Sequence, residues 1–345
     1  MQISRIAVSD DTPDGRFSAI SHGSGFIKFL VPNLRYVGTT TLPLEGKLAP
    51  SRMQSHSNMT AGTTFANPLP SNQVTGFRTT DTFDMRKLWT MSIFRLSETS
   101  TPAASSNDLI GFSHCEDYDQ DSVWKSVHVV LSSDLGVTWT RPVPILTAQD
   151  RQPKNGEPAY NGGLGDMAAV WDNAKRRWVA FSQEVGMIGL GIAVSTDPRG
   201  ASLTWSKYDP LNNLYSSGLM GLGYGHPDLA SMPGSNPTLL YDVLEKGWVI
   251  VYHAWQGSLA WATSTDLDRW SIPQFLDELT SSGSLVYNYP SLAGNISDTM
   301  TNQRTNILSY GKFPHGLTEA RFLVTRTIQF RTSQPPILGA PELLL

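Results

Sequence analysis

Short apolar stretches recur along the chain, and each ends at a turn rich in Asp, Gly, Ser or Pro. Arg177–Glu184 and Gly247–His253 are examples, since both run almost without interruption through Val, Ala, Ile, Phe or Tyr. Runs of this length between turn residues predict β-strands. No window keeps the 3.6-residue period of a helix, and the nearest candidate, Gln274–Leu279, is too short. The pattern therefore predicts an all-β protein.

Three of these stretches belong to a longer repeat. Each copy has an apolar strand, a second strand that ends in Ser-x-Asp, and a Trp shortly afterwards. Trp178 and Trp248, in corresponding places of two copies, lie 70 residues apart. A further strand precedes each copy, at Leu88–Leu96, Asp166–Trp171 and Asn236–Tyr241. Four strands in about 65 residues are typical of one blade of a β-propeller.

The repeat predicts a single domain over residues 1–345, a five-bladed β-propeller with four-stranded antiparallel blades. The blades are expected at residues 1–80, 81–147, 158–210, 232–278 and 285–330, followed by a C-terminal strap at 331–345. The fourth of the more regular units lacks the Asp turn. Residues 1–80 are less regular, and their best strands are Phe17–Val31 and Val74–Thr79.

The Asp turns have a structural explanation. Ser132–Trp139 reads Ser-x-Asp-x-Gly-x-x-Trp, and Ser195–Trp205 and Ser264–Trp270 are an expanded and a shortened copy. The carboxylate accepts backbone N–H groups of the turn, Gly supplies a positive φ, and Trp packs beneath the hairpin. We therefore expect Asp134, Asp197 and Asp266 to hold turns at the end of each blade that lies away from the ligand.

Composition narrows the function classes. Charged residues make up only 16% of the chain and the net charge is −4, so no basic surface indicates a nucleic-acid partner. No apolar run is long enough to cross a membrane, and the first residues do not read as a signal peptide. The single cysteine, Cys115, permits neither an intrachain disulfide nor a zinc site built on cysteines. Little Lys with much Ser, Thr and Trp favours an extracellular or periplasmic protein. The oligomeric state stays open.

Carboxylates at the ends of strands are the candidates for chemistry. In a propeller, the start of the first strand and the loop from the second to the third strand open on one face. The catalytic candidates chosen by this rule are Asp84 (or Asp81), Asp166, Glu184, Glu116 and Asp117. The candidate substrate-binding residues are His22, Trp124, Tyr224, His226, Asn236, His253, Trp255 and Tyr289. Acids among aromatic rings suit glycoside hydrolysis, in which one carboxyl protonates the leaving group and another acts as base or nucleophile.

The blade pattern of roughly residues 80–330 resembles that of five-bladed glycosidases such as glycoside hydrolase family 43, and the Asp turns resemble those of sialidases. The first resemblance implies a carbohydrate substrate and acids on the innermost strands of successive blades, where Asp84 and Asp166 fall. Asn236 departs from that pattern, and Glu184 is the expected substitute. We expect an inverting hydrolase, with Asp84 or Asp166 as base or orienting acid and Glu184 as general acid, Glu116 or Asp117 being the alternative. Sialidase chemistry is not expected, because an Arg-Ile-Pro opening and a set of three arginines at blade starts are missing.

Two other functions stay open. A non-catalytic sugar-binding propeller would have stacking aromatics without a facing pair of carboxylates. A polysaccharide lyase would use a His or Tyr base and a neutralising cation, for which His253, Tyr252 and Lys125 are available. No cofactor is expected. His114, His226 and His253 show no metal-ligand spacing, whereas a calcium ion held by carbonyl and carboxylate oxygens would leave no trace in the sequence.

Overall fold

The structure is a computed structural model of the chain. It describes residues 16, 18–21, 26–32, 37–43, 88–99, 104–119, 122–135, 139–140, 142–148, 161–184, 189–209, 214–217, 225–276, 285–294, 299–302, 304–314, 322–331, 334–339 and 342–343. The chain divides into two compact units, which are taken in turn below. One holds Leu34–Val37 and Thr63–Ala230, and the other holds Met1–Asn33, Gly38–Gly62 and Ser231–Leu345.

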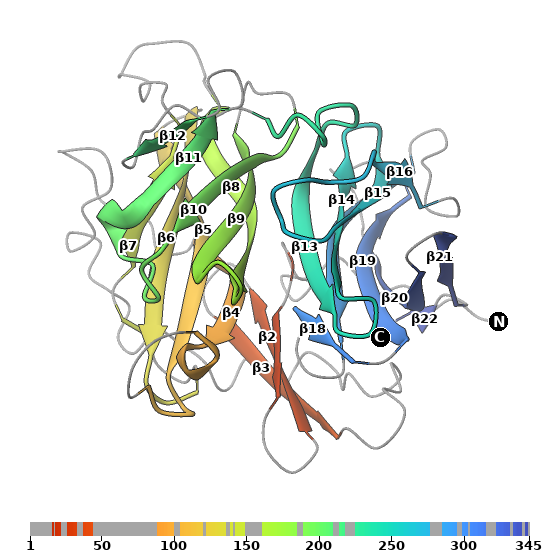
Figure 1. Cartoon of the computed structure of the whole chain (residues 1–345), viewed down its shortest axis with the longest axis horizontal. Helices are drawn as coiled ribbons and strands as arrows, with labels where there is room; N and C mark the ends of the chain where they lie inside the picture. The colour runs from red at the N-terminus through yellow and green to blue at the C-terminus, as the bar shows by residue number, and fades with distance from the viewer. Residues whose placement is uncertain are drawn as a thin grey trace. The chain divides into compact units, whose positions relative to one another are not determined.

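The unit around residues 63–230 contains one nine-stranded sheet (Figure 1). Its strands are β4 (Leu88–Arg95), β5 (Leu109–Asp119), β6 (Ser122–Ser132), β7 (Val143–Thr147), β8 (Asn161–Asp172), β9 (Arg177–Glu184), β10 (Gly191–Ser195), β11 (Trp205–Asp209) and β12 (Leu214–Ser217). They form two antiparallel groups, β4 to β7 and β8 to β12. The groups are joined because the start of β8 pairs in parallel with β6, from Val123 opposite Asn161 to Lys125 opposite Gly163.

Aromatic residues fill the space between these two groups. Trp178 on β9 meets Phe94 and Phe112 of β4 and β5 edge to face, with ring centroids 5.0 and 4.9 Å apart. Trp205 on β11 meets Phe112 at 5.7 Å. All four rings are buried. Edge-to-face pairs add to the free energy gained by burying the rings, so this cluster fixes one group against the other.

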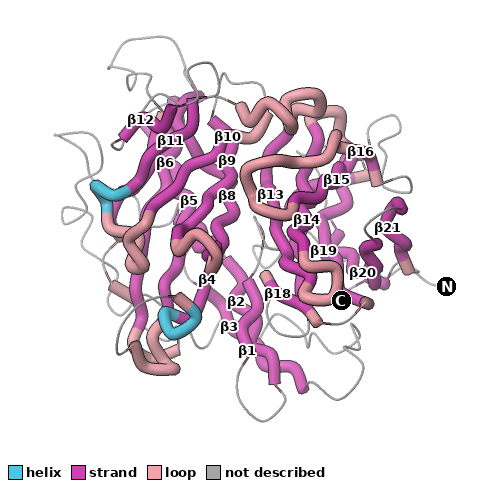
Figure 2. The backbone as a smooth tube through the Cα atoms, in the orientation of Figure 1, coloured by secondary structure: helices cyan, strands magenta, loops and turns pink. Residues whose placement is uncertain are grey.

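The second unit carries two five-stranded sheets and a three-stranded one. The first has β13 (Gly234–Asp242), β14 (Gly247–Ala254), β15 (Ser258–Ser264), β16 (Gln274–Phe275) and β18 (Met300–Thr301). The second has β17 (Val286–Ala293), β19 (Thr305–Phe313), β20 (Phe322–Arg331), β21 (Gln334–Leu338) and β22 (Glu342–Leu343). The small sheet has β1 (Ser18–Ser21), β2 (Phe26–Pro32) and β3 (Val37–Pro43), and the tube of Figure 2 is likewise mostly strand and loop.

The described chain is thus nearly all β, as predicted, and its helical segments are two three-residue 3-10 turns, Leu96–Glu98 and Ser202–Thr204. The residues expected to form a C-terminal strap supply β21 and β22, both of which pair with β20. No helix in the described part of the chain is long and apolar enough to cross a membrane.

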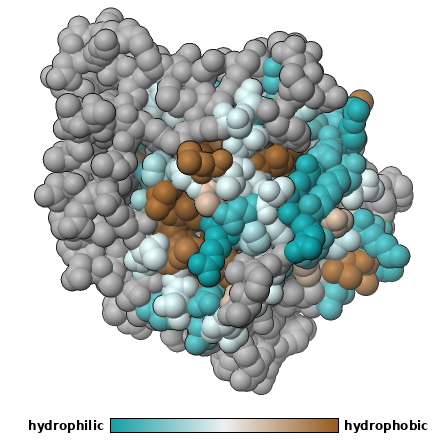
Figure 3. Space-filling model, turned by 60° about the vertical axis from the view of Figure 1, so that its left-hand side comes forward, coloured by the Kyte–Doolittle hydropathy of each residue, from teal (hydrophilic) through white to brown (hydrophobic). Residues whose placement is uncertain are grey.

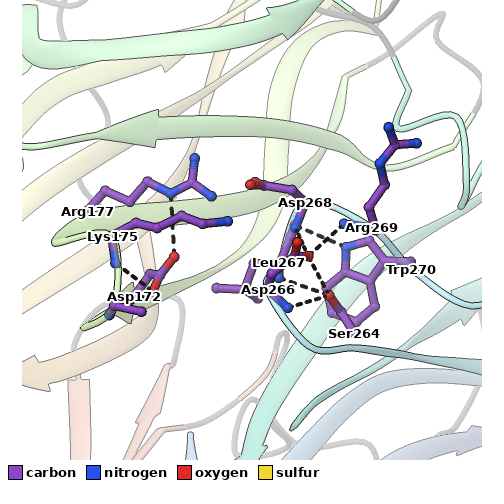
Figure 4. A network of polar contacts seen from close by, with 10 residues as sticks. Asp172, Lys175, Arg177, Ser264, Asp266, Leu267, Asp268, Arg269 and Trp270 are labelled. Carbon is purple, nitrogen blue, oxygen red and sulfur yellow. Dashed lines mark hydrogen bonds and ion pairs between the residues drawn. The ribbon is translucent and has the colours of Figure 1, made fainter.

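The turns at Asp266 and Asp197 make the contacts expected of them, with one difference at Asp266. Asp266 Oδ1 accepts the N–H groups of Asp268 and Arg269, both at 3.0 Å, and Trp270 Nε1–H donates to the Leu267 carbonyl (Figure 4). In this turn the positive φ falls on Leu267, directly after the Asp, at 67°. The carboxylate and the buried indole therefore hold a left-handed residue that is not glycine.

Asp197 holds its longer turn in the same way. Its two carboxylate oxygens accept the N–H groups of Arg199 and Ala201, each at 3.0 Å. Gly200, at φ 59°, takes the left-handed position here. In the first copy the left-handed residue is Leu135, at φ 59°, next to Asp134.

Four strands, β4, β8, β13 and β17, are each the first in chain order of their group or sheet, and they share an irregularity. Register shifts occur between Gly165 and Ala168, between Ser235 and Thr238, and between Asn288 and Ser291. In these three places the residue after the first-named one is left-handed: Asp166 at φ 48°, Asn236 at 51° and Tyr289 at 52°. The register of β4 also shifts, between Thr90 and Ser92. A bulge of this kind bends the strand and takes backbone groups out of the ladder.

A hydroxyl group compensates for the shift in both units. The Ala169 N–H of β8 donates to Ser92 Oγ of β4, and the Leu292 N–H of β17 donates to Thr238 Oγ1 of β13, both at 3.1 Å. In each case the donor lies three residues after the left-handed residue of its strand. Successive first strands are therefore tied together by side chain and backbone.

Replacing Thr238 by Val should leave the Leu292 N–H buried without an acceptor. We expect a loss of about 1–3 kcal/mol in the free energy of unfolding, measured by urea denaturation. Thr238→Ser keeps the hydroxyl and serves as the control, with a smaller loss that reflects one missing methyl group. Equal losses in the two variants would contradict the role of the hydroxyl.

Candidate functional site

Asp166 is the central residue of the candidate site in the unit around residues 63–230. It lies at the bulge of β8, in the left-handed conformation and partly exposed. Its backbone N–H donates to His114 Nδ1 of β5 at 3.0 Å. Among the described residues, its carboxylate oxygens have no hydrogen-bond or ion-pair partner. A strained, accessible carboxylate without a structural partner is typical of a functional position.

Glu116 lies two residues beyond His114 on β5, so both side chains lie on the same side of the strand. His114 Nε2 is 3.3 Å from Glu116 Oε1, and Lys125 Nζ on β6 is 3.8 Å from the same oxygen. Because Nδ1 accepts the Asp166 N–H, the proton of a neutral His114 lies on Nε2, which donates to Glu116. The Glu116 side chain is 17% exposed, so it is open to a ligand.

Glu184 ends β9, and its backbone lies opposite Leu164 of β8, two positions before Asp166. Glu184 Oε2 accepts a hydrogen bond of 2.8 Å from Lys207 Nζ on β11. The two side chains are 9% and 2% exposed. An ammonium group at this distance favours the charged carboxylate. Glu184 therefore suits the role of an ionised orienting group better than that of the general acid that the sequence predicts.

The strand register places these carboxylates away from the Asp turns of the same sheet. Leu164 pairs with Glu184 at one end of the β8–β9 hairpin, and Trp171 pairs with Trp178 at the other. Trp178 in turn pairs with Ser195, directly before the Asp197 turn. Asp172 closes the hairpin at that far end, where its Oδ1 accepts the Ala174 and Lys175 N–H groups (Figure 4). Within this sheet, the candidate carboxylates and the Asp197 turn therefore lie at opposite ends of the β8–β9 hairpin.

The unit around residues 231–345 has a polar cluster at the equivalent bulges. Asn236 Nδ2–H donates to Asn288 Oδ1 at 3.1 Å, and the Tyr289 N–H donates to the same oxygen at 2.8 Å. His253 Nδ1 lies 2.6 Å from the Tyr287 carbonyl. A carbonyl can only accept, so Nδ1 carries a proton. Asn236 and His253 are buried, and Tyr289 is partly exposed.

Trp255 is the most exposed of the predicted sugar-stacking rings that the structure describes, at 47%. It follows Ala254, which pairs with Gly234 at the bulge end of β13. Large apolar side chains reach the surface elsewhere too, and Figure 3 shows apolar patches beside hydrophilic ones. The position of Trp255 at the bulge end, rather than its exposure alone, makes it a candidate for sugar binding.

Two other predicted binding residues are enclosed by protein. Trp124 on β6 is 1% exposed, so its ring has no open face for a sugar, and the prediction of a stacking role is corrected on this ground. His226 is buried and its Nδ1 accepts the Asp228 N–H at 3.2 Å, within a turn. Both side chains contribute to the folded structure at these positions.

Three of the remaining predicted residues, and the side chain of a fourth, lie outside the described part. Asp84, His22 and Tyr224 fall outside the described residues. Of Asp117 the structure describes the backbone, which lies opposite Trp124 in the β5–β6 hairpin. Among the described residues, no group of three or more His, Cys, Asp and Glu side chains could hold a metal ion.

The expectations based on single residues missed Lys207, Asn288 and the positioning contact of His114. Lys207 could have been found from the alternation in β11, which places it on the same side as Trp205. The bulges can also be recognised in the sequence. In each first strand, the residue at the register shift is followed by two residues and then by an apolar one. The four segments are Thr90-Met-Ser-Ile93, Asp166-Met-Ala-Ala169, Asn236-Pro-Thr-Leu239 and Tyr289-Pro-Ser-Leu292.

Comparison with known proteins finds solved structures with a similar fold. No protein-family model and no curated protein matches the sequence. Solved structures do match. An exo-1,5-α-L-arabinanase from a bovine ruminal metagenomic library has a TM-score of 0.51 at 10% identity, over 98% of this chain and 100% of its own.

Two fungal enzymes are also similar. The α-L-arabinofuranosidase of Podospora anserina has a TM-score of 0.41 at 9% identity, over 68% of this chain and 63% of its own. The catalytic domain of a Coprinopsis cinerea family-62 α-L-arabinofuranosidase has a TM-score of 0.43 at 8% identity, over 69% and 66%. The chain thus spans slightly less than two thirds of each fungal protein. The arabinanase match shows a shared fold, so the expected likeness to β-propeller glycoside hydrolases is confirmed at the level of the fold.

Removing Lys207 should destabilise the protein strongly, because it leaves the buried Glu184 carboxylate without its partner. We expect Lys207→Met to lower the free energy of unfolding by about 3–5 kcal/mol. The double variant Glu184→Leu with Lys207→Met should recover most of this loss, since it removes both charges. Urea denaturation of the three proteins measures the effect, and a double variant as unstable as the single one would contradict the pairing.

His128 makes stability depend on pH. Burial, and in second place the charge of His114, lowers the pKa of His128 to about 3. The unfolded chain binds this proton near pH 6.5 and the folded chain does not, so stability falls as pH drops from 6.5 towards 3. The full effect is about 5 kcal/mol. His128→Gln should flatten this part of the stability–pH curve, measured by urea denaturation at a series of pH values, whereas an unchanged slope would contradict the assignment.

Proposed function

We propose that this protein is a glycoside hydrolase in which Asp166 is a catalytic carboxylate. The observation that carries the proposal is Asp166 itself: a partly exposed, left-handed acid at the bulge of β8, without a partner for its carboxylate among the described residues. The shared fold with an arabinanase supports it. Glu116 provides a second, accessible acid on the neighbouring strand.

We assign Asp166 the role of base and Glu116 that of general acid. The general acid must hold a proton and give it to the leaving group. Both acids have a lysine nearby, but the Lys207 contact of Glu184 is the closer, at 2.8 Å against 3.8 Å for Lys125 and Glu116. Glu184 is also the less exposed, at 9% against 17%, so it suits the role of a buried charge beside the site. Glu116 was the alternative acid from the sequence, and its carboxylate lies next to the imidazole that holds the Asp166 backbone.

A lyase gains no support from the groups that would serve as its base. Tyr252 is fully buried and its hydroxyl donates to the Met232 carbonyl. Burial raises the pKa of Tyr252, which makes the phenolate harder to form. His253 uses Nδ1 for the Tyr287 carbonyl and is buried.

Several finer features belong to the same proposal. Five blades are supported by four groups with a bulged first strand and by the separate β1–β3 sheet. Inversion is what the resemblance to five-bladed glycosidases implies, and it requires carboxyl groups about 6.5–9.5 Å apart around the scissile bond. Trp255, Tyr289 and Asn236 are the proposed sugar-binding residues of the other unit. An extracellular or periplasmic location fits a polysaccharide substrate.

The proposal predicts release of reducing sugar from a panel of polysaccharides and aryl glycosides that begins with arabinan and xylan. Asp166→Asn should lower kcat/KM by roughly 10²–10⁴-fold, as expected for loss of a general base. Asp172→Asn, the same change at the far end of the hairpin, is the control and should stay within about twofold, because an amide oxygen can still accept the turn N–H groups.

The assignment of the acid has its own readout. Glu116→Gln should lose much activity on glycosides with poor leaving groups and little on dinitrophenyl glycosides, which need no protonation. Full activity of Asp166→Asn would refute the proposed chemistry. Sugar binding by the wild-type protein without turnover of any glycoside in the panel would instead indicate a non-catalytic binding propeller.

A further inference from the structure

His114 occupies a place where the β17 bulge uses a different group. At the β17 bulge, the N–H of the left-handed Tyr289 is accepted by the side chain of the residue before it, Asn288, at 2.8 Å. At the β8 bulge the preceding residue is Gly165, which has no side chain. The acceptor for the Asp166 N–H comes from the neighbouring strand β5 instead, as His114 Nδ1 at 3.0 Å.

The absence of a side chain at Gly165 is what allows His114 to serve as the acceptor. A Cβ atom on Gly165 would lie 2.0 Å from His114 Nδ1 and 2.2 Å from Cε1. Only a residue without a side chain lets the imidazole approach the backbone so closely. His114 is itself buried, between the aromatic cluster at Phe112 and the carboxylate of Glu116 on the same strand. Its ring is therefore fixed by packing as well as by hydrogen bonds.

We propose that His114 is a positioning residue that sets the direction of the Asp166 carboxylate and links it to Glu116. The inference rests on the proposed function. Non-glycine residues are disfavoured in the left-handed conformation, so a group that accepts the Asp166 N–H there stabilises the geometry in which the carboxylate is presented. The neutral ring has its proton on Nε2, which donates to Glu116 Oε1 at 3.3 Å. One imidazole thus orients the backbone of one acid and the side chain of the other.

Two substitutions separate the two hydrogen bonds. In His114→Asn the amide oxygen takes the place of Nδ1 and can accept the Asp166 N–H, while the donor to Glu116 is lost. In His114→Gln the amide nitrogen takes the place of Nε2 and can donate to Glu116, while the acceptor for Asp166 is lost. The positioning effect is proposed to come from the hydrogen bond to the Asp166 N–H. The two variants should therefore differ in the exchange of the Asp166 amide and in kcat, even if their thermal stabilities are equal.

The first readout needs no substrate. Hydrogen exchange followed by NMR should show the Asp166 amide protected in the wild-type protein and in His114→Asn, and about tenfold or more faster in His114→Gln, because its acceptor is gone. The ¹⁵N shifts of His114 should show the proton on Nε2. Equal exchange of the Asp166 amide in the two variants, or a proton on Nδ1, would overturn the inference.

The second readout is kinetic. His114→Gln should lower kcat at least about tenfold more than His114→Asn, with similar KM values, because a small misplacement of a catalytic group acts on the chemical step. If Asp166→Asn abolishes turnover while the two His114 variants have the same kcat, the positioning role is wrong and the proposed function stands. If Asp166→Asn is fully active, the proposed function falls and this inference falls with it.

Discussion

A left-handed residue at the bulge of β8 is the constraint on which the candidate site depends. The bulge takes the backbone of Asp166 out of the β8–β9 ladder, so its N–H must find an acceptor elsewhere. That acceptor is a side chain of the adjoining strand group, His114. The same backbone geometry recurs at Asn236 and Tyr289, where it carries no acid. The proposed chemistry therefore depends on which side chain the repeated bulge carries.

Along β5 and β9, the side chains near this bulge change from apolar at one end to charged at the other. Phe112, His114 and Glu116 lie in succession on one side of β5, and Trp178 and Glu184 lie on one side of β9. The aromatic end excludes water and fixes the two strand groups against each other. The charged end places carboxylates next to cations in largely buried surroundings. Electrostatic interactions are stronger there than in water, which is the condition under which fixed charges contribute to catalysis.

More of the fold than of the candidate site could be predicted from the sequence. Repeated Trp strands such as Arg177–Glu184 and Gly247–Ala254 follow from local patterns of apolar and turn residues, and the structure has strands there. The role of Glu184 could not be derived in that way, because its ion pair with Lys207 joins two strands that are not neighbours in the sheet. The contact of His114 with Asp166 spans 52 residues. Trp124 has an aromatic ring near predicted acids, and only the packing shows that the ring is enclosed. Pairings across strands depend on register, and register shifts at bulges are the part that single-sequence patterns specify least.

We propose that the chemistry takes place at the bulge of β8 and not at the Asp turns. A crystal structure of the Asp166→Asn variant with a bound oligosaccharide tests this most directly. We expect a sugar whose anomeric carbon lies within reach of residue 166, directly or through one water molecule, at about 3–3.5 Å from the attacking atom. An oligosaccharide bound with its glycosidic bonds remote from residue 166, at the Asp197 end of the same sheet, would contradict it.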